Sequence, residues 1–364
     1  MSGFKGIINK FKGYRKMKTY SQFVECYYEF ILEGAYNDEH ALRKTWNHFM
    51  VHKKHGAEVR KHLDAGDHEA ALHHMKGEVE KAKHDPKHPL SFEKSKRGFK
   101  GGKTDADKKS YHQEMDNAVH GAHTLATKER RTANAAKKGL PMKNTGTGKS
   151  EVKKSWAKHG ATNTTPKRDV EIHDPKNKKH GIGISMKKPG GSQLMSGGPQ
   201  ETHATIAHAA KEHAKQLKKS GKSKEEVDAA TKDIHSRSER ATKALKAMER
   251  GSRERKDALK KVAQRHLDKM HDAHPGLSRH IGSEASSGNK KYGKSVSAGS
   301  GQASVILKGA DTKKGVDSKV QDIHRRERAG GFDKGRIRAA MPKSDKVNPK
   351  TGKTRSGNAK LDER

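Results

Sequence analysis

Cysteine, aromatic side chains and long apolar runs are all scarce in this chain of 364 residues. The single cysteine, Cys26, cannot form an internal disulfide or a thiolate metal cluster, which is typical of a protein made in a reducing compartment. No apolar run approaches the roughly 20 residues of a membrane span, and the basic N-terminus lacks the apolar centre of a signal peptide. We therefore expect a cytoplasmic protein without a membrane partner.

The chain is poor in apolar residues and rich in positive charge. Apolar residues make up 29% of the sequence, well below the roughly 45–50% of ordinary globular domains, so compact parts separated by solvated chain are expected. With 80 Lys and Arg against 43 Asp and Glu, the net charge is +37. Such a surplus attracts polyanions by releasing their counterions, although it also serves solubility. Aromatic residues, at 5%, are too few for single-strand stacking platforms, so we predict double-stranded DNA as the partner.

Helical periodicity predicts an N-terminal helical region over residues 1–83. Residues 17–34, 37–56 and 67–83 each place apolar side chains at helical spacing and are expected to pack as a small bundle. Residues 84–149 are predicted to form a basic linker with one helix at about 110–138 and a loop at its end. Residues 311–364 are predicted to form a basic, largely disordered tail.

Residues 150–310 carry the predicted core, which makes the expected fold class α+β. A short helix over 150–160 precedes two alternating runs, 169–173 and 181–187, that flank a polar turn. If these runs pair, Asp169, Glu171, Ser185 and Lys187 share one surface, because alternate side chains of a strand point to the same face. A plain solvated strand face is the alternative. A helical insertion at about 218–290 separates this hairpin from a further strand at 303–308.

Basic and glycine-rich segments beside these runs suggest contacts to phosphate. Glycines flank the loop GGSQLMSGG, so its backbone amides could approach an anion near the start of the following helix. We expect nucleic-acid contacts from Lys167, Arg168, Lys188, Ser192 and Gln193. The alternative for this loop is a flexible connection between a strand and a helix.

The sequence TPKRD, followed by a hairpin turn and GISMKK, resembles the PD-(D/E)XK nuclease superfamily. The resemblance implies a small restriction-endonuclease-like mixed sheet flanked by helices, in which one strand carries an aspartate and its neighbour carries acid-x-lysine. Carried over to this chain, it implies catalytic roles for Asp169, Lys187 and Gln193. It also implies a Mg²⁺ or Mn²⁺ ion held by Asp169 with Glu171 or Glu151, while Lys187 positions or helps deprotonate the attacking water.

One position departs from the pattern of this superfamily. Ser185 stands two residues before Lys187, where the motif has Asp or Glu. The metal would then need Glu171, Glu151 or Glu201 as a second carboxylate, or the site binds DNA without cutting it. We therefore expect a DNA-binding protein that is a candidate metal-dependent endonuclease.

The alternative function is non-enzymatic. The run MKTYSQFVECYYEFILEG resembles the start of many small proteins of tailed phages. This second resemblance implies a host-cell cytoplasmic or virion location, and a basic virion or internal protein that binds or condenses nucleic acid. A basic RNA-associated protein is a third possibility.

Two other patterns indicate no site. The 25 histidines include a series, His203, His208 and His213, that recurs every five residues, about 140° apart around a helix. These rings do not converge on one ion, and we predict surface histidines. TGTGKS lacks the first glycine of a phosphate-binding P-loop, so we expect no nucleotide cofactor.

Overall fold

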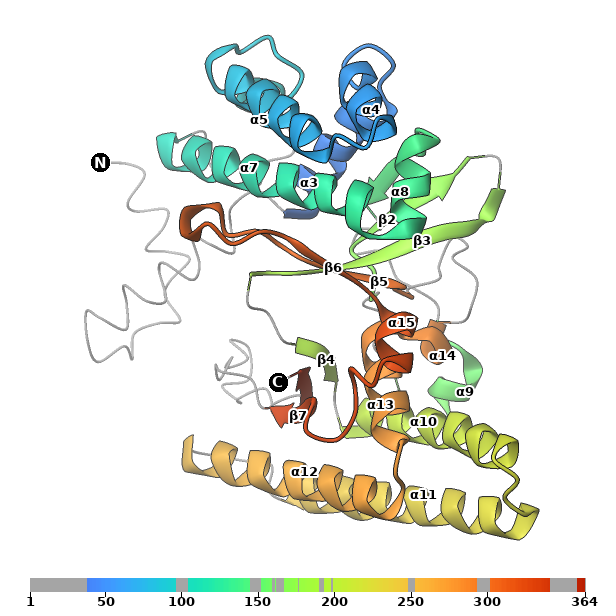
Figure 1. Cartoon of the computed structure of the whole chain (residues 1–364). Helices are drawn as coiled ribbons and strands as arrows, with labels where there is room; N and C mark the ends of the chain where they lie inside the picture. Colours follow the sequence, from blue (N-terminus) through green and yellow to red (C-terminus); the bar gives the residue numbers. More distant parts are fainter. Residues whose placement is uncertain are drawn as a thin grey trace.

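The computed structural model describes residues 38–95, 104–144, 152–158, 161, 167–175, 177–189, 193–197, 199–247, 253–292, 302–340 and 359–363. It is a mixed α+β structure in which one group of helices lies on each side of a central sheet (Figure 1). The α+β class expected from the sequence is confirmed. The helix predicted over residues 17–34, together with Glu151 and Ser192, lies outside the described residues.

The first group of helices comes from the N-terminal part of the chain. The predicted segments 37–56 and 67–83 are helical, and Asp67 caps the second by accepting a hydrogen bond from the backbone N–H of Ala70. Thr104 and Asp107 form a capping box at the start of the longest helix of this group. The elements are α3 (Asp38–Trp46), the π-helical η1 (Asn47–Val51), α4 (Ala57–Asp64), α5 (His68–His84), α6 (Phe92–Ser95), α7 (Asp105–Lys128) and α8 (Arg130–Lys137).

The central sheet has five strands in the order β1-β2-β3-β5-β6. The predicted hairpin is confirmed, since β2 and β3 are antiparallel with Val170 opposite Ile184 and Ile172 opposite Ile182. β3 and β5 are parallel, and the other neighbouring pairs are antiparallel. The strands are β1 (Met142–Asn144), β2 (Val170–Asp174), β3 (Asn177–Lys187), β5 (Val305–Lys308) and β6 (Lys319–Asp322).

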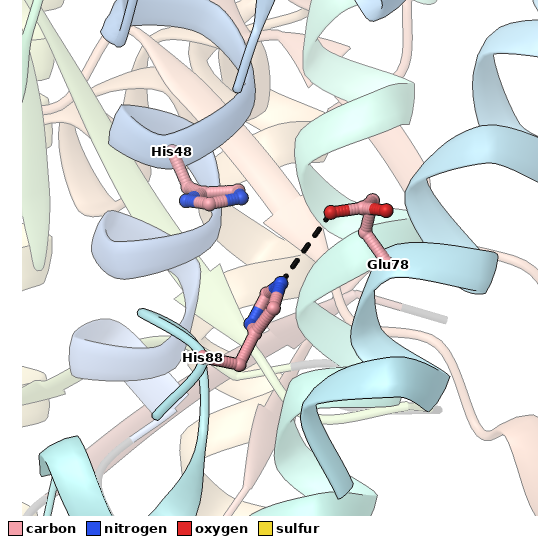
Figure 2. Close-up of side chains that lie close together, drawn as sticks. All are labelled: His48, Glu78 and His88. Atoms are coloured by element: carbon pink, nitrogen blue, oxygen red, sulfur yellow. Dashed lines mark hydrogen bonds and ion pairs between the residues drawn. The ribbon is translucent and has the colours of Figure 1, made fainter. Parts of the chain in front are cut away.

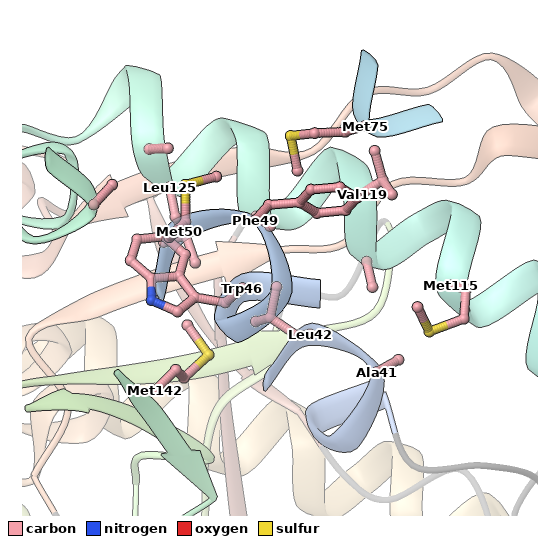
Figure 3. Close-up of a cluster of buried hydrophobic side chains, with 14 of the residues drawn as sticks. Ala41, Leu42, Trp46, Phe49, Met50, Met75, Met115, Val119, Leu125 and Met142 are labelled. Carbon is pink, nitrogen blue, oxygen red and sulfur yellow. The ribbon is translucent and has the colours of Figure 1, made fainter. Parts of the chain in front are cut away.

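The N-terminal helices and one face of the sheet share a single apolar core. Trp46 and Phe49, both 0% exposed, lie on α3 and η1 among Met75, Val119 and Met142 (Figure 3). Val170, Ile172, Ile184, Val305 and Leu307 belong to the same cluster. The helices therefore cover the sheet rather than forming a bundle of their own.

A second apolar core lies on the opposite face of the sheet. In β5 the side chains alternate, so Val305 and Leu307 enter the first core while Ile306 enters the second. This alternation explains why three consecutive residues of β5 are all apolar, since a strand covered on both faces needs no polar side. The second core also receives Ile281 and Phe332.

The second group of helices covers this opposite face. It contains α9 (Lys154–Ala157), α10 (Pro199–Lys219), α11 (Lys224–Ala247), α12 (Arg253–Ala273), α13 (Leu277–Ser287), α14 (Asn289–Tyr292) and α15 (Ile323–Arg328). The predicted helical insertion at about 218–290 is confirmed, since most of its described residues form α11, α12 and α13. Gly288, with a φ of 61°, ends α13 in the left-handed conformation that favours glycine.

Three predictions about loops and the tail are wrong. The loop expected before residue 149 contains β1, and the expected glycine-rich loop contains β4 (Gln193–Gly197). β4 belongs to a second sheet of order β4-β8-β7, with β7 (Ile337–Ala340) and β8 (Ala359–Glu363). The described residues of the predicted disordered tail therefore hold strands and α15, because apolar residues such as Ile323 and Leu361 are buried in the second core.

Each helix of the described residues is too short or too polar to cross a membrane. The mean hydropathy of the chain, −1.14, is consistent with this finding.

Candidate active site

The strand pairing brings Asp169 and Lys187 together at one end of the hairpin. The backbone N–H of Asp169 donates to the carbonyl of Ile184 at 2.8 Å, which continues the ladder one residue beyond β2. The Asp169 carboxylate accepts hydrogen bonds from the Met186 backbone N–H and the Ser185 side chain. Burial raises the pKa of Asp169, and the nearby Lys187 ammonium is among the groups that oppose this rise. The Asp169 carboxylate and the Lys187 ammonium group therefore lie near each other, as the pairing of the two strands predicts.

Asp169 and Lys187 line a cavity of about 210 Å³ at the end of β3 and β5. Two acidic residues that the sequence analysis did not select, Glu39 of α3 and Glu114 of α7, line the same cavity, together with Asn117. The close approach of α7 to the sheet depends on Gly121, where a Cβ would lie 3.2 Å from Leu42 and 3.3 Å from Leu307. We call this space the Asp169–Lys187 cavity.

The other expected carboxylates do not line this cavity. Glu171 is 1% exposed and forms an ion pair with Arg168 at 2.7 Å and with Lys143 at 3.7 Å. Glu201 is also buried and pairs with Lys291 on the far side of the sheet. The expectation that Glu171 shares an open surface with Asp169 and Lys187 is therefore wrong, because its carboxylate is buried against Arg168, Lys143 and Gly181.

The residues expected to contact nucleic acid are placed in different environments. Lys188 is exposed and lines the Asp169–Lys187 cavity. Arg168 is 6% exposed and lies against Glu171, so it does not reach the surface as expected. Lys167 donates to the carbonyl of Leu194 at 3.3 Å, and burial lowers its pKa to about 7. Gln193 begins β4 and is not among the residues that line the cavity.

Ser185, which occupies the position of the motif acid, is 3% exposed. Its side chain hydrogen-bonds to Asp169. Serine at this position therefore supports the orientation of the aspartate, and acidic groups from α3 and α7 enter the cavity instead.

A second, larger cavity of about 820 Å³ lies on the opposite face of the sheet. It is lined by polar side chains, among them His280, Ser283, Glu284, Lys290, His324 and Glu327. Burial raises the pKa of Glu284 to about 7, even though the backbone N–H groups of Lys290 and Lys291 donate to it. The polar groups here hydrogen-bond to one another, and neither Asp169 nor Lys187 reaches them.

The donor chemistry of the Asp169–Lys187 cavity suits a hard cation. Glu39, Glu114 and Asp169 offer carboxylate oxygens, the ligand type that Mg²⁺ takes, whereas the amide oxygen of Asn117 already accepts hydrogen bonds from Gln113 and Thr312. Among the described residues, these carboxylates do not form a group of three with ligand atoms within 4.8 Å of one another. A metal here would therefore use one or two of them and keep several waters, which is the usual protein coordination of Mg²⁺.

Comparison with known proteins identifies no relative: no family model, no curated protein and no solved structure matches the chain.

Proposed function

We propose that the protein binds double-stranded DNA and cleaves its phosphodiester bonds with the help of a divalent metal ion, on a restriction-endonuclease-like core. The observation that carries the proposal is the meeting of Asp169 and Lys187 at one end of paired strands, in a cavity that Glu39 and Glu114 also line. A mixed sheet with helices on both faces is the architecture that the resemblance to PD-(D/E)XK nucleases implies.

Each group has a defined part in this chemistry. The Asp169 carboxylate is fixed by the Met186 N–H and Ser185, so it enters the reaction with little freedom to lose. Lys187, at the end of β3, would hold the attacking water or accept its proton. The metal ion, when bound by Asp169 with Glu39 or Glu114, would stabilise the charge that develops on the phosphoryl oxygens.

The charge of the whole chain supports a nucleic-acid substrate. A net charge of +37 on 364 residues draws the DNA backbone to the protein by counterion release. Exposed Lys188 at the cavity would contact a phosphate next to the cleaved bond. We infer that binding is largely independent of sequence and weakens steeply as salt rises.

The test is a nicking assay on supercoiled plasmid with Mg²⁺ or Mn²⁺. We expect nicking by the wild type, its loss with a chelator, and a drop of at least about 100-fold in Asp169→Asn and Lys187→Ala, the range for a lost general base. Two matched controls are Asp174→Asn at the other end of β2 and exposed Lys319→Ala on β6, neither of which lines the cavity. Both controls should nick like the wild type.

Gel shifts on the same variants separate binding from cleavage. We expect Asp169→Asn and Lys187→Ala to bind DNA almost as tightly as the wild type, because each changes the large positive charge by only one unit. Tight binding without nicking in any metal by the wild type would refute cleavage and favour the DNA-binding or condensing protein. If the affinity for DNA does not change between low and high salt concentration, the proposal that the partner is nucleic acid is refuted.

A further inference from the structure

Three side chains of metal-ligating type meet away from the Asp169–Lys187 cavity. His48 comes from η1, Glu78 from α5 and His88 from the turn that follows α5. Each residue offers one ligand atom, and these three atoms all lie within 4.8 Å of one another. Among the described residues, this is the group of His, Cys, Asp or Glu side chains that meets this spacing. Figure 2 shows the three side chains directed toward a common space between their elements.

The spacing of these atoms is close to that of a tetrahedral site. Bonds of about 2.0–2.2 Å from Zn²⁺ to nitrogen or carboxylate oxygen place neighbouring ligand atoms roughly 3.3–3.5 Å apart. His88 Nε2 and Glu78 Oε2 are 3.4 Å apart. His48, within 4.8 Å of both, would need to move by about 1.5 Å at most to complete the face of a tetrahedron.

His48 provides an independent observation that points to a ligand. Its side chain is 7% exposed, and its Nε2 atom is buried without a hydrogen-bond partner in the protein. A buried polar nitrogen left unpaired is costly and rare in native proteins. The π-helical segment of His48, η1, is of a kind that is frequent at functional sites.

His88 is held in place by its own turn. The backbone N–H of Leu90 donates to His88 Nδ1 at 3.1 Å, so in the metal-free protein the ring proton lies on Nε2 and faces Glu78. A metal ion at Nε2 would replace that proton, which would move to Nδ1. The exchange gives up the hydrogen bond from Leu90 and the one to Glu78, a smaller loss than the gain from the metal–ligand bonds.

His55 lies against His48 but is not placed to supply a fourth ligand. His55 stacks on His48 with ring centroids 4.7 Å apart and an interplanar angle of 19°. The nitrogen lone pairs lie in the planes of the rings. Because the two planes are nearly parallel, the lone pairs of His48 and His55 do not converge on one ion. His55 therefore shields the imidazole of His48, and water takes the fourth position.

We propose that His48, Glu78 and His88 bind one Zn²⁺ ion, with water as the fourth ligand. Imidazole with a single carboxylate is a donor set that Zn²⁺ accepts. The ion would tie η1 to α5 and to the turn that carries His88. Since η1 continues α3, whose Glu39 lines the Asp169–Lys187 cavity, the ion would also fix the helix that contributes to that cavity.

The experiment uses full-length protein that has been stripped with a chelator and dialysed. Co²⁺ is added as a spectroscopic probe for tetrahedral coordination, and Zn²⁺ is titrated against a chromogenic chelator so that weak sites on the other histidines do not compete. The ligand variants are Glu78→Gln and His88→Gln. The matched controls on the same helix are Glu80→Gln and His73→Gln, both exposed.

We expect one tightly held Zn²⁺ per chain in the wild type and in both controls. The two ligand variants should bind at least about 10-fold more weakly, since losing even a supporting residue has that effect. Zinc should raise the melting temperature of the wild type and not of the ligand variants. Circular dichroism identifies a variant that does not fold. If His88→Gln fails to fold, the test depends on Glu78→Gln, whose side chain is 18% exposed and therefore tolerates replacement better.

Two results would overturn the assignment. One is a wild type that holds no Zn²⁺ against the competing chelator. The other is a folded Glu78→Gln protein that binds Zn²⁺ as tightly as the Glu80→Gln control. Neither result bears on DNA cleavage, because this site shares no residue with the Asp169–Lys187 cavity.

Discussion

Replacing Lys291 by methionine should destabilise the protein strongly. Lys291 on α14 is 1% exposed, and its ammonium group pairs with Glu201 on α10, which is 7% exposed. The ammonium also lies 5.7 Å from the Trp156 ring centroid and 5.1 Å from that of Tyr292. Methionine keeps the length and apolar character of the stem, so the change removes the charge and leaves most of the packing.

The size of the loss follows from burial. Removing one partner of a buried ion pair costs about 3–5 kcal/mol, because the remaining charge stays in an apolar environment. The lost cation–π contacts add about 0.5–2 kcal/mol. We expect the free energy of unfolding to fall by at least about 3 kcal/mol, which is a large share of the roughly 5–15 kcal/mol of a typical domain.

The assay is urea unfolding followed by circular dichroism, with a double variant as the decisive arm. Lys291→Met with Glu201→Gln removes both charges and should recover much of the lost stability, since no buried charge is left unpaired. Lys222→Met is the control, because its ion pair with Glu226 lies at the surface, with both side chains 52% exposed, and should matter little. The reasoning is refuted if Lys291→Met unfolds near the wild-type midpoint, or if the double variant is less stable than the single one.

Two further predictions concern the contacts of α13. Gly282→Ala should cost about 1–3 kcal/mol by overpacking, because a Cβ there would lie 2.6–2.7 Å from atoms of the buried Phe332 side chain. Urea unfolding measures the loss, and a gain in stability would contradict the packing. Burial alone would raise the pKa of Glu327, but hydrogen bonds from His280, Ser283 and a neighbouring histidine outweigh it and lower this pKa from 4.5 to about 2. The ionised carboxylate therefore adds stability above pH 4.5 that is lost as the pH falls toward 2. Glu327→Gln should melt well below the wild type at pH 7, and the gap should narrow below pH 4.5 and nearly close near pH 2, whereas a gap that does not change with pH would refute this.

Local patterns were sufficient to predict the elements whose residues are neighbours in the sequence. Alternation along residues 169–187 predicted the β2–β3 hairpin, and helical spacing predicted α5 and most of α7. The three-residue β1 carries too little pattern, since its place is fixed by pairing with β2 some thirty residues later. β7 and β8 were missed because their surroundings are rich in lysine and arginine, and only the second core buries Ile337 and Leu361.

Only part of the candidate site could be predicted from the sequence. Asp169 and Lys187 were found because strand pairing brings them together directly. Glu39 and Glu114 reach the cavity through the packing of α3 and α7 on the sheet, and neither has a distinctive neighbourhood in the sequence. The prediction of surface histidines is wrong for His208 and His213, which are 7% and 3% exposed. It considered rings on one helix, whereas the proposed ligands His48 and His88 come from separate elements.

The parallel pairing of β3 with β5 has a consequence during synthesis. Gly183 and Ser304 are hydrogen-bonded across 121 residues, and Leu307, Gly309 and Ala310 form one wall of the Asp169–Lys187 cavity. At about 5–20 residues per second, a ribosome needs on the order of ten seconds to make the intervening chain. The nascent protein therefore carries its aspartate and lysine for that time without an enclosed site, and any cleaving activity begins only after β5 and the residues that follow it have been made.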